Sequence, residues 1–322
     1  MTLKKKIILA SLSINLLLML SGCGAAAASG FSTETLSDTK TVSSTEALSD
    51  TEAPSSTNTA SSCKRQMGTV VTIPDFYSPQ LGTDDNVLRI YLPYGYESST
   101  QSYPVIYMPD GQNLFSSTTA TYGKAWCIGV SIDTMRMAGK TDGIIVVGID
   151  APSNRTKAYN LYLDSYEGGG SGLANATSDF YADTVKPYID ENYRTLSDRE
   201  HTAILGSSYG AIVSFNTALR HSELFGSIGM FSYCDNQAPK QMTDFLKENM
   251  TDEALGCPSI YFFTGNYDFA RESTLLAYQI ASENDMEHIC LEEDENGEHD
   301  EYTWSDHFED CLSFWGWIND GQ

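Results

Sequence analysis

The sequence predicts an α/β fold with a mostly parallel central sheet, helices on both of its faces, and an antiparallel pair of strands near the N-terminus. Alternating residues at 69–73 and 86–92, joined by the turn-rich 79–85, predict the antiparallel pair. Continuous apolar runs typical of strands buried on both faces follow at 105–108, 144–149, 203–205, 227–231, 259–263 and 288–291. Helix-like segments alternate with them at 126–138, 178–192, 211–221, 240–248, 272–282 and 304–318. A ligand crevice is expected at the carboxyl ends of the parallel strands.

The N-terminus carries a targeting signal rather than a membrane span. Three lysines at 4–6 precede an apolar run of about 14 residues, which is shorter than the ~18 that a spanning helix needs. The sequence Leu20-Ser21-Gly22-Cys23 resembles the lipobox of bacterial lipoproteins. The resemblance implies a signal peptide at 1–22 and a lipid on Cys23 that anchors the protein at the extracellular face of a bacterial cell envelope. The alternative is an ordinary signal peptide with an incidental cysteine.

A linker and a catalytic domain are predicted after the signal peptide. Residues 23–62 are rich in Ser, Thr and Glu, with near copies at 34–39 and 46–51, and they predict a disordered linker behind the lipid anchor. Residues 63–322 are rich in aromatic residues and long enough for one domain with a large core. This is the expected catalytic domain.

Charge and cysteine spacing exclude several classes of function. The formal net charge of -24 disfavours nucleic acid and anionic lipid as ligands, so membrane contact is expected through the lipid anchor only. Six cysteines beyond Cys23 are too widely spaced for a disulfide framework or a zinc site, and no metal or cofactor is predicted. They allow 15 full pairings, among which the sequence does not choose. They are Cys63, Cys127, Cys234, Cys257, Cys290 and Cys311.

A G-x-S-x-G pentapeptide at 206–210 stands between an apolar strand and a helix-like segment. This context is that of a nucleophile elbow, in which a sharp turn exposes the central serine, here Ser208. The amide of Tyr209, at the start of the following helix, would stabilise an oxyanion. The alternative to a nucleophile elbow is that the pentapeptide is only a turn of small residues.

A serine nucleophile needs a base and an acid that orients the base. His299 lies in a polar loop between the last strand and the last helix, where it can reach the elbow, and His307 is the second choice. Asp268 follows the strand that ends at 263, and Asp235 is the alternative acid. The chain order of Ser208, Asp268 and His299 is that of the α/β-hydrolase fold.

Several sequence markers resemble the Putative esterase family of α/β-hydrolases, which includes feruloyl and acetylxylan esterases of carbohydrate esterase family 1, enterochelin esterases and antigen 85 mycolyltransferases. They are the sequences at 92–96, 103–115, 193–196 and 206–210, followed by His299-Asp300-Glu301 and Trp304. The resemblance implies the same triad and assigns the second oxyanion donor to the N–H of Gln112. Two positions depart from the family pattern: Ala211 replaces a glycine, and Ala158 replaces a glutamate after Arg155.

The expected function is an extracellular serine esterase that forms an acyl-enzyme and acts on acetyl or feruloyl esters of polysaccharide or on small phenolic esters. A siderophore esterase, an acyltransferase and a non-catalytic binding lipoprotein are the alternatives. Beyond the triad, side chains expected to contact substrate are Asp110, Asn113, Trp126, Arg155 and Trp304.

Overall fold

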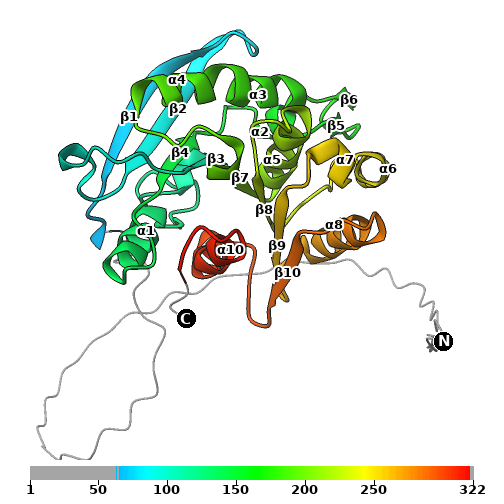
Figure 1. The fold of residues 1–322 in the computed structure, drawn as a ribbon. Coiled ribbons are helices and arrows are strands. Elements are labelled where there is room, and N and C mark those ends of the chain that lie inside the picture. The colour runs from blue at the N-terminus through cyan, green and yellow to red at the C-terminus, as the bar shows by residue number, and fades with distance from the viewer. Residues whose placement is uncertain (1–62, 64, 320–322) are drawn as a thin grey trace, which may run out of the picture. The chain divides into compact units, whose positions relative to one another are not determined.

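The computed structural model describes Cys63 and residues 65–319, and these residues are built around one eight-stranded sheet (Figure 1). The predictions for 1–22 and 23–62, including Cys23, lie outside the described residues. The strand order is β1-β2-β4-β3-β7-β8-β9-β10. The strands are β1 (Thr69–Ser78), β2 (Thr83–Leu92), β3 (Val105–Pro109), β4 (Ile145–Ile149), β7 (Thr202–Ser207), β8 (Ser227–Phe231), β9 (Ser259–Gly265) and β10 (Ile289–Asp294).

The pairing confirms the predicted fold class. β1 and β2 form an antiparallel pair, and β2 also runs antiparallel to β4. All pairs from β4 to β10 are parallel. The carboxyl ends of β3, β7, β8, β9 and β10 therefore lie at one edge of the sheet, where a crevice is expected.

Helices cover both faces of the sheet. One apolar cluster packs α1 (Ile128–Met137), α9 (Glu301–Asp306) and α10 (Phe308–Phe314) against the sheet. The other face is covered by α2 (Arg155–Tyr159), α3 (Ala174–Phe180), α4 (Lys186–Asn192), α5 (Tyr209–Arg220), α6 (Pro239–Asn249), α7 (Asp252–Leu255) and α8 (Arg271–Glu283). In Figure 1, α3 and α4 lie on one side of the sheet and α1 and α10 on the other.

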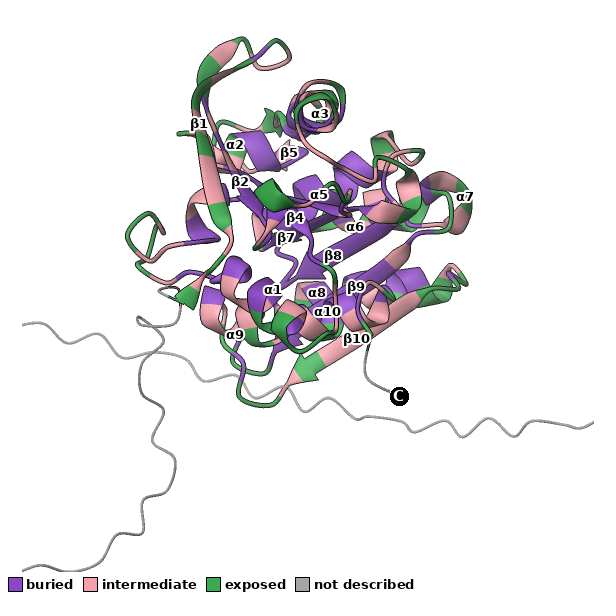
Figure 2. Ribbon diagram, turned by 60° about the vertical axis from the view of Figure 1, so that its left-hand side comes forward, coloured by how far each residue is buried: buried purple, intermediate pink, exposed green. Residues whose placement is uncertain are grey.

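The strands β3, β4, β7 and β8 are buried at every position because both of their faces are covered. Val105 and Tyr107 of β3 point into one cluster, and Ile106 and Met108 point into the other. Figure 2 shows β7 and β8 buried along their length, whereas edge strand β1 has many exposed and partly exposed positions.

Some elements differ from the sequence prediction. The segment 304–318 forms two helices, α9 and α10, which meet at His307. The segment 178–192 lies in a longer helical stretch in which a π-helical turn, Tyr181–Val185, joins α3 and α4. Short elements that carry too few residues for a periodic signal were not predicted: α2, α7, the strands β5 (Tyr162–Leu163) and β6 (Gly170–Ser171), and 3-10 turns at Tyr96–Ser98, Gly111–Asn113 and Arg199–His201.

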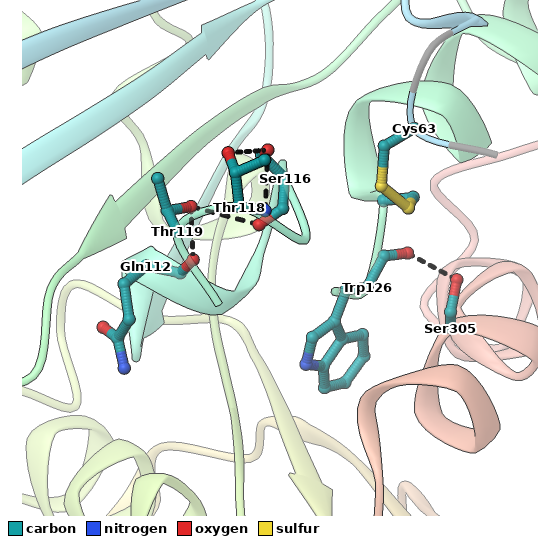
Figure 3. The surroundings of a disulfide bond; sticks show 8 residues. Cys63, Gln112, Ser116, Thr118, Thr119, Trp126 and Ser305 are labelled. Carbon is teal, nitrogen blue, oxygen red and sulfur yellow. Dashed lines mark hydrogen bonds between the residues drawn. A yellow bond between two sulfur atoms is a disulfide. The ribbon is translucent and has the colours of Figure 1, made fainter. Parts of the chain in front are cut away.

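One of the possible cysteine pairs is a disulfide in the structure, between Cys63 and Cys127. Cys127 directly precedes α1, and the bond joins residues 64 positions apart in the sequence. Figure 3 shows the bond beside Trp126, whose carbonyl accepts a hydrogen bond from Ser305. The disulfide thus fixes the beginning of the described domain to the start of α1.

We expect the Cys63→Ser, Cys127→Ser double variant to lose about 2–4 kcal/mol of unfolding free energy, because a closed loop of this length restricts the unfolded chain. Urea denaturation of the oxidised protein and the variant measures the difference. Reductant should lower the stability of the wild type and leave the variant unchanged; equal urea midpoints for the oxidised wild type and the variant would contradict this expectation.

Candidate active site

Ser208 stands at a strained turn between β7 and α5. Its backbone has φ 57° and ψ -127°, a conformation that non-glycine residues rarely adopt. The turn is tight because strand and helix touch: a Cβ on Gly206 would lie 2.3 Å from the carbonyl oxygen of Gly210. The Ser208 N–H donates to the carbonyl of Phe231 on the neighbouring strand at 3.0 Å. The predicted elbow is therefore present in the described fold, and it directs Ser208 to the carboxyl edge of the sheet.

His299 and Asp268 meet at the same edge. Asp268 lies in the loop after β9, His299 lies in the loop after β10, and these strands are neighbours. The Nδ1 atom of His299 is 2.7 Å from Oδ1 of Asp268. The Asp268 side chain is fully buried, and that of His299 is 15% exposed. A buried carboxylate bonded to Nδ1 holds the imidazole in the tautomer whose Nε2 accepts a proton.

Two glycines bring these loops together. A Cβ on Gly265 would lie 2.2 Å from the carbonyl oxygen of Gly297, so the backbones cross in contact. The Tyr267 N–H donates to that same Gly297 carbonyl at 2.9 Å. The crossing fixes the loop that carries Asp268 against the loop that carries His299.

Asp268 is held in its charged form. Burial alone would raise the pKa of this carboxyl, but the hydrogen bond and charge of His299, the Ser232 hydroxyl and the Ala270 N–H outweigh burial, and the net pKa is lowered. The Ala270 N–H donates to Oδ1 at 2.7 Å. The carboxylate can therefore stabilise a positive charge on His299.

Ser232 is a supporting residue that the sequence analysis did not identify. It directly follows β8, is completely buried, and accepts a hydrogen bond from Trp304 Nε1 at 2.7 Å. The Ser232 hydroxyl also helps to lower the pKa of the Asp268 carboxyl. Asp268 Oδ1 meets His299 Nδ1 and the Ala270 N–H, whereas the buried Oδ2 has no hydrogen-bond partner among the described residues. Trp304 also packs edge-on against the His299 ring, with centroids 5.1 Å apart.

We expect Ser232→Ala to lower kcat/KM by about tenfold, because it leaves the buried Trp304 N–H beside His299 without its acceptor and removes a hydroxyl that favours charged Asp268. Without the hydroxyl the pKa of Asp268 should rise from its lowered value, which weakens the carboxylate that stabilises charged His299. The matched control is Ser273→Ala, which removes a hydroxyl bonded to Asp235 at 2.7 Å. Steady-state kinetics measures the loss, and a loss in Ser232→Ala no larger than that in Ser273→Ala would contradict this role.

The alternative base, His307, and the alternative acid, Asp235, lie outside the His299–Asp268 pair. Both ring nitrogens of His307 face carboxylates of β10: Nδ1 is 2.6 Å from Glu292 and Nε2 is 3.2 Å from Asp294. Asp235 accepts from Ser273, and no histidine in the described part of the chain pairs with it. The structure thus joins His299 to Asp268 and leaves the second choices, His307 and Asp235, outside the pair.

Two groups among the described residues have ligand atoms close enough together for a metal ion: Asp179, Asp183 and His221, and Glu292, His307 and Asp310. Both groups lie outside the cavity at Ser208. In each, the histidine is already hydrogen bonded to a carboxylate of the group. All six residues are partly buried or exposed, and these contacts tie neighbouring segments together near the surface.

A cavity of about 470 Å³ opens at Ser208 and His299. Of the predicted substrate contacts, Asp110, Asn113, Arg155 and Trp304 line it, together with Tyr209 and Gln112. Trp126 is not among the lining residues; it packs against Phe231 and Trp304 in the core. The remaining lining residues are Thr121, Tyr122, Ser207, Cys234, Asn236, Phe269 and Glu301.

The loop after β3 is braced by an ion pair. Arg155 donates to both oxygens of Asp110 at 2.7 Å, and its guanidinium lies over the rings of Tyr159 and Tyr209. Burial opposes the charge of Arg155, but the Asp110 carboxylate outweighs burial and raises the pKa of the guanidinium. Asp110 takes the hydrogens of Arg155 Nε and Nη2, and this ion pair supports the 3-10 turn that contains Gln112.

Comparisons with known proteins show what this chain is similar to. A sequence model of the family described as Putative esterase matches residues 78–315. The chain is 31% identical over 149 residues to an endo-1,4-beta-xylanase/feruloyl esterase of Xylanibacter ruminicola, a match that covers 45% of this chain and 19% of that protein. It is 25% identical over 152 residues to the uncharacterized protein YbbA of Bacillus subtilis, covering 44% of this chain and 54% of the relative. The chain thus spans between a fifth and about half of the length of these two relatives.

Solved structures share the fold. A ferulic acid esterase superposes with a TM-score of 0.60 at 22% identity, covering 77% of this chain and 97% of that one. The enterobactin esterase FES from Shigella flexneri superposes with a TM-score of 0.57 at 14% identity, covering 77% and 59%. The family model covers most of the described residues, so the chain belongs to the Putative esterase family.

Proposed function

We propose that this protein is a serine esterase in which Ser208 attacks the ester carbonyl, His299 acts as general base and acid, and Asp268 orients His299. The observation that carries the proposal is the buried Asp268–His299 pair at the cavity that Ser208 lines. His299 takes the proton of Ser208 during attack and returns it to the leaving alcohol. Water then hydrolyses the acyl-enzyme by the same proton transfers.

The oxyanion is proposed to bind between the N–H groups of Tyr209 and Gln112. Tyr209 begins α5 and Gln112 lies in a 3-10 turn, and N–H groups in the first turn of a helix lack intrahelical partners. The Gln112 side chain is occupied elsewhere, since Oε1 accepts from the Ala151 N–H at 2.9 Å. Its backbone is thereby held in place for the role.

We propose esters of hydroxycinnamic or acetic acid on polysaccharide as the substrates. Two strongly exposed aromatic side chains line the cavity, Tyr122 at 82% and Phe269 at 71% exposure. Exposed aromatic residues beside an ester-cleaving site are suited to stacking on sugar or phenolic rings. The feruloyl esterase in the name of one relative supports this substrate class, while the likeness to an enterobactin esterase keeps siderophore esters as a second candidate.

Export and lipid attachment at Cys23 remain proposals, as do the boundaries of the signal (1–22), linker (23–62) and esterase domain (63–322). The lipobox-like sequence supports lipidation, and the Cys63–Cys127 disulfide supports an oxidising, extracellular compartment. Among the described residues, no helix is long and apolar enough to cross a membrane. Incorporation of a labelled fatty acid into the wild type, compared with Cys23→Ala, tests the attachment.

Hydrolysis of methyl ferulate, p-nitrophenyl acetate and an enterobactin-type trilactone by the purified protein tests the proposed substrates. Preferred turnover of the first two supports a carbohydrate esterase. Preferred turnover of the trilactone would shift the assignment to a siderophore esterase. Transfer to added sugar in place of water would reveal an acyltransferase, and binding of all three without turnover would overturn the proposed esterase activity.

A further inference from the structure

A buried carboxylate in the cavity wall has no role in the proposed triad. Glu301 begins α9, is 5% exposed and lines the cavity that contains Ser208 and His299. The other carboxylate lining this cavity, Asp110, is neutralised by Arg155. Glu301 takes part in no ion pair in the described part of the chain, and burial raises the pKa of its carboxyl. Burying such a group is unfavourable unless hydrogen-bond donors meet it.

Asn113 supplies one donor and fixes the geometry. Its Nδ2 donates to Glu301 Oε1 at 3.0 Å, while its Oδ1 accepts from the Thr121 N–H at 2.8 Å. Because a backbone N–H can only donate, the orientation of the Asn113 amide is determined. Oε1 of Glu301 is therefore the oxygen held by the protein, and Oε2 accepts no hydrogen bond from another residue described in the structure.

We propose that Glu301, held by Asn113, determines specificity by accepting a hydrogen bond from a hydroxyl group of the ester substrate. This inference rests on the proposed esterase function and adds which chemical group of the substrate the cavity recognises. A carboxylate oxygen accepts from a hydroxyl but repels the oxygen of an ether, which cannot donate. The cavity should thus favour substrates with unblocked hydroxyl groups over their methyl ethers. The hydroxyl lies either on the aromatic acyl ring or on the sugar.

Glu301→Gln separates this role from a structural one. Asn113 still donates, so the amide oxygen of the new side chain must take that bond, and its NH2 group then faces the cavity in place of an acceptor. An NH2 group donates equally well to a hydroxyl or an ether oxygen. The variant should therefore lose discrimination, whereas general damage to the site would lower the turnover of both substrates together.

The experiment compares kcat/KM for two matched pairs of substrates at mildly alkaline pH. The acyl pair is methyl 3,4-dihydroxycinnamate and methyl 3,4-dimethoxycinnamate. The alcohol pair is methyl 5-O-acetyl-α-L-arabinofuranoside and its 2,3-di-O-methyl ether. We expect the wild type to prefer the hydroxylated member of one pair by about tenfold or more and Glu301→Gln to bring that ratio near one, because sites that bind a hydroxyl discriminate against analogues lacking it.

The pair whose ratio falls identifies the part of the substrate that meets Glu301. The matched control is Glu298→Gln, which removes the same charge from an exposed position in the loop before α9 and should leave both ratios unchanged. Wild-type ratios near one, or unchanged ratios in Glu301→Gln, would overturn the role of Glu301 while leaving the esterase intact. No hydrolysis of any of the four esters by the wild type would instead refute the proposed function.

If Glu301→Gln fails to fold, as the absence of a cooperative melting transition would show, Glu301→Asp tests the same role of Glu301. It keeps the charge but withdraws the carboxylate by one methylene, so the ratio of the affected pair must again fall. An unchanged ratio in a folded Glu301→Asp variant would contradict the proposal.

Discussion

Ser208→Ala is expected to lower kcat/KM for p-nitrophenyl acetate by about a thousandfold or more, because removal of a triad nucleophile leaves only binding and oxyanion stabilisation. The strained backbone of Ser208, with φ 57°, serves to place this hydroxyl at the sheet edge. Steady-state kinetics of the folded variant measures the loss.

Ser207→Ala is the matched control, since Ser207 is the other serine of the pentapeptide and ends β7. Its loss should not exceed about tenfold. Equal losses in the two variants would mean that the elbow, and not the Ser208 hydroxyl, is what the reaction needs. An effect confined to Ser207→Ala would reassign the nucleophile.

Asp268→Asn should lower kcat/KM by about 10³–10⁴-fold, an effect known for the aspartate of serine protease triads. The amide can present its NH2 group to Nδ1 of His299, which favours the tautomer that cannot accept the serine proton. Asp235→Asn is the control: this residue is also buried, but it pairs with Ser273 and should retain most of the activity.

The same substitution should change the pH dependence of stability. The pKa of Asp268 is lowered in the folded protein, so its contribution is present above the ordinary carboxyl pKa and is lost as pH falls through the lowered value. The stability difference between wild type and Asp268→Asn should therefore be larger near neutral pH than in acid. A difference that grows on acidification would contradict a charged Asp268.

The sequence predicted the parts of the site that have a local signal. The pentapeptide around Ser208 and the polar loops after two apolar strands identified residues that the fold brings to one edge, because neighbouring parallel strands end together. Periodicity also placed most strands and the longer helices. Short elements such as α2 and α7 carried too few residues to be recognised.

Contacts between distant segments could not be predicted in the same way. Gly265 and Gly297 look like ordinary loop glycines until their backbones are seen to cross. Ser232 acts only through Trp304 and Asp268, which come from other elements. Its position directly after a predicted strand was the available signal, but nothing in the sequence around it indicates burial of its hydroxyl.

The most direct test is covalent labelling of the wild type with a p-nitrophenyl phosphonate, followed by intact-mass and peptide mass spectrometry. A phosphonate reacts with an activated serine and stays attached. We predict one adduct, on the peptide containing Ser208, with loss of esterase activity in proportion to labelling, no adduct on Ser208→Ala, and slow labelling of Asp268→Asn. Full activity without an adduct, or an adduct on another residue, would contradict the central claim that Ser208 is the nucleophile.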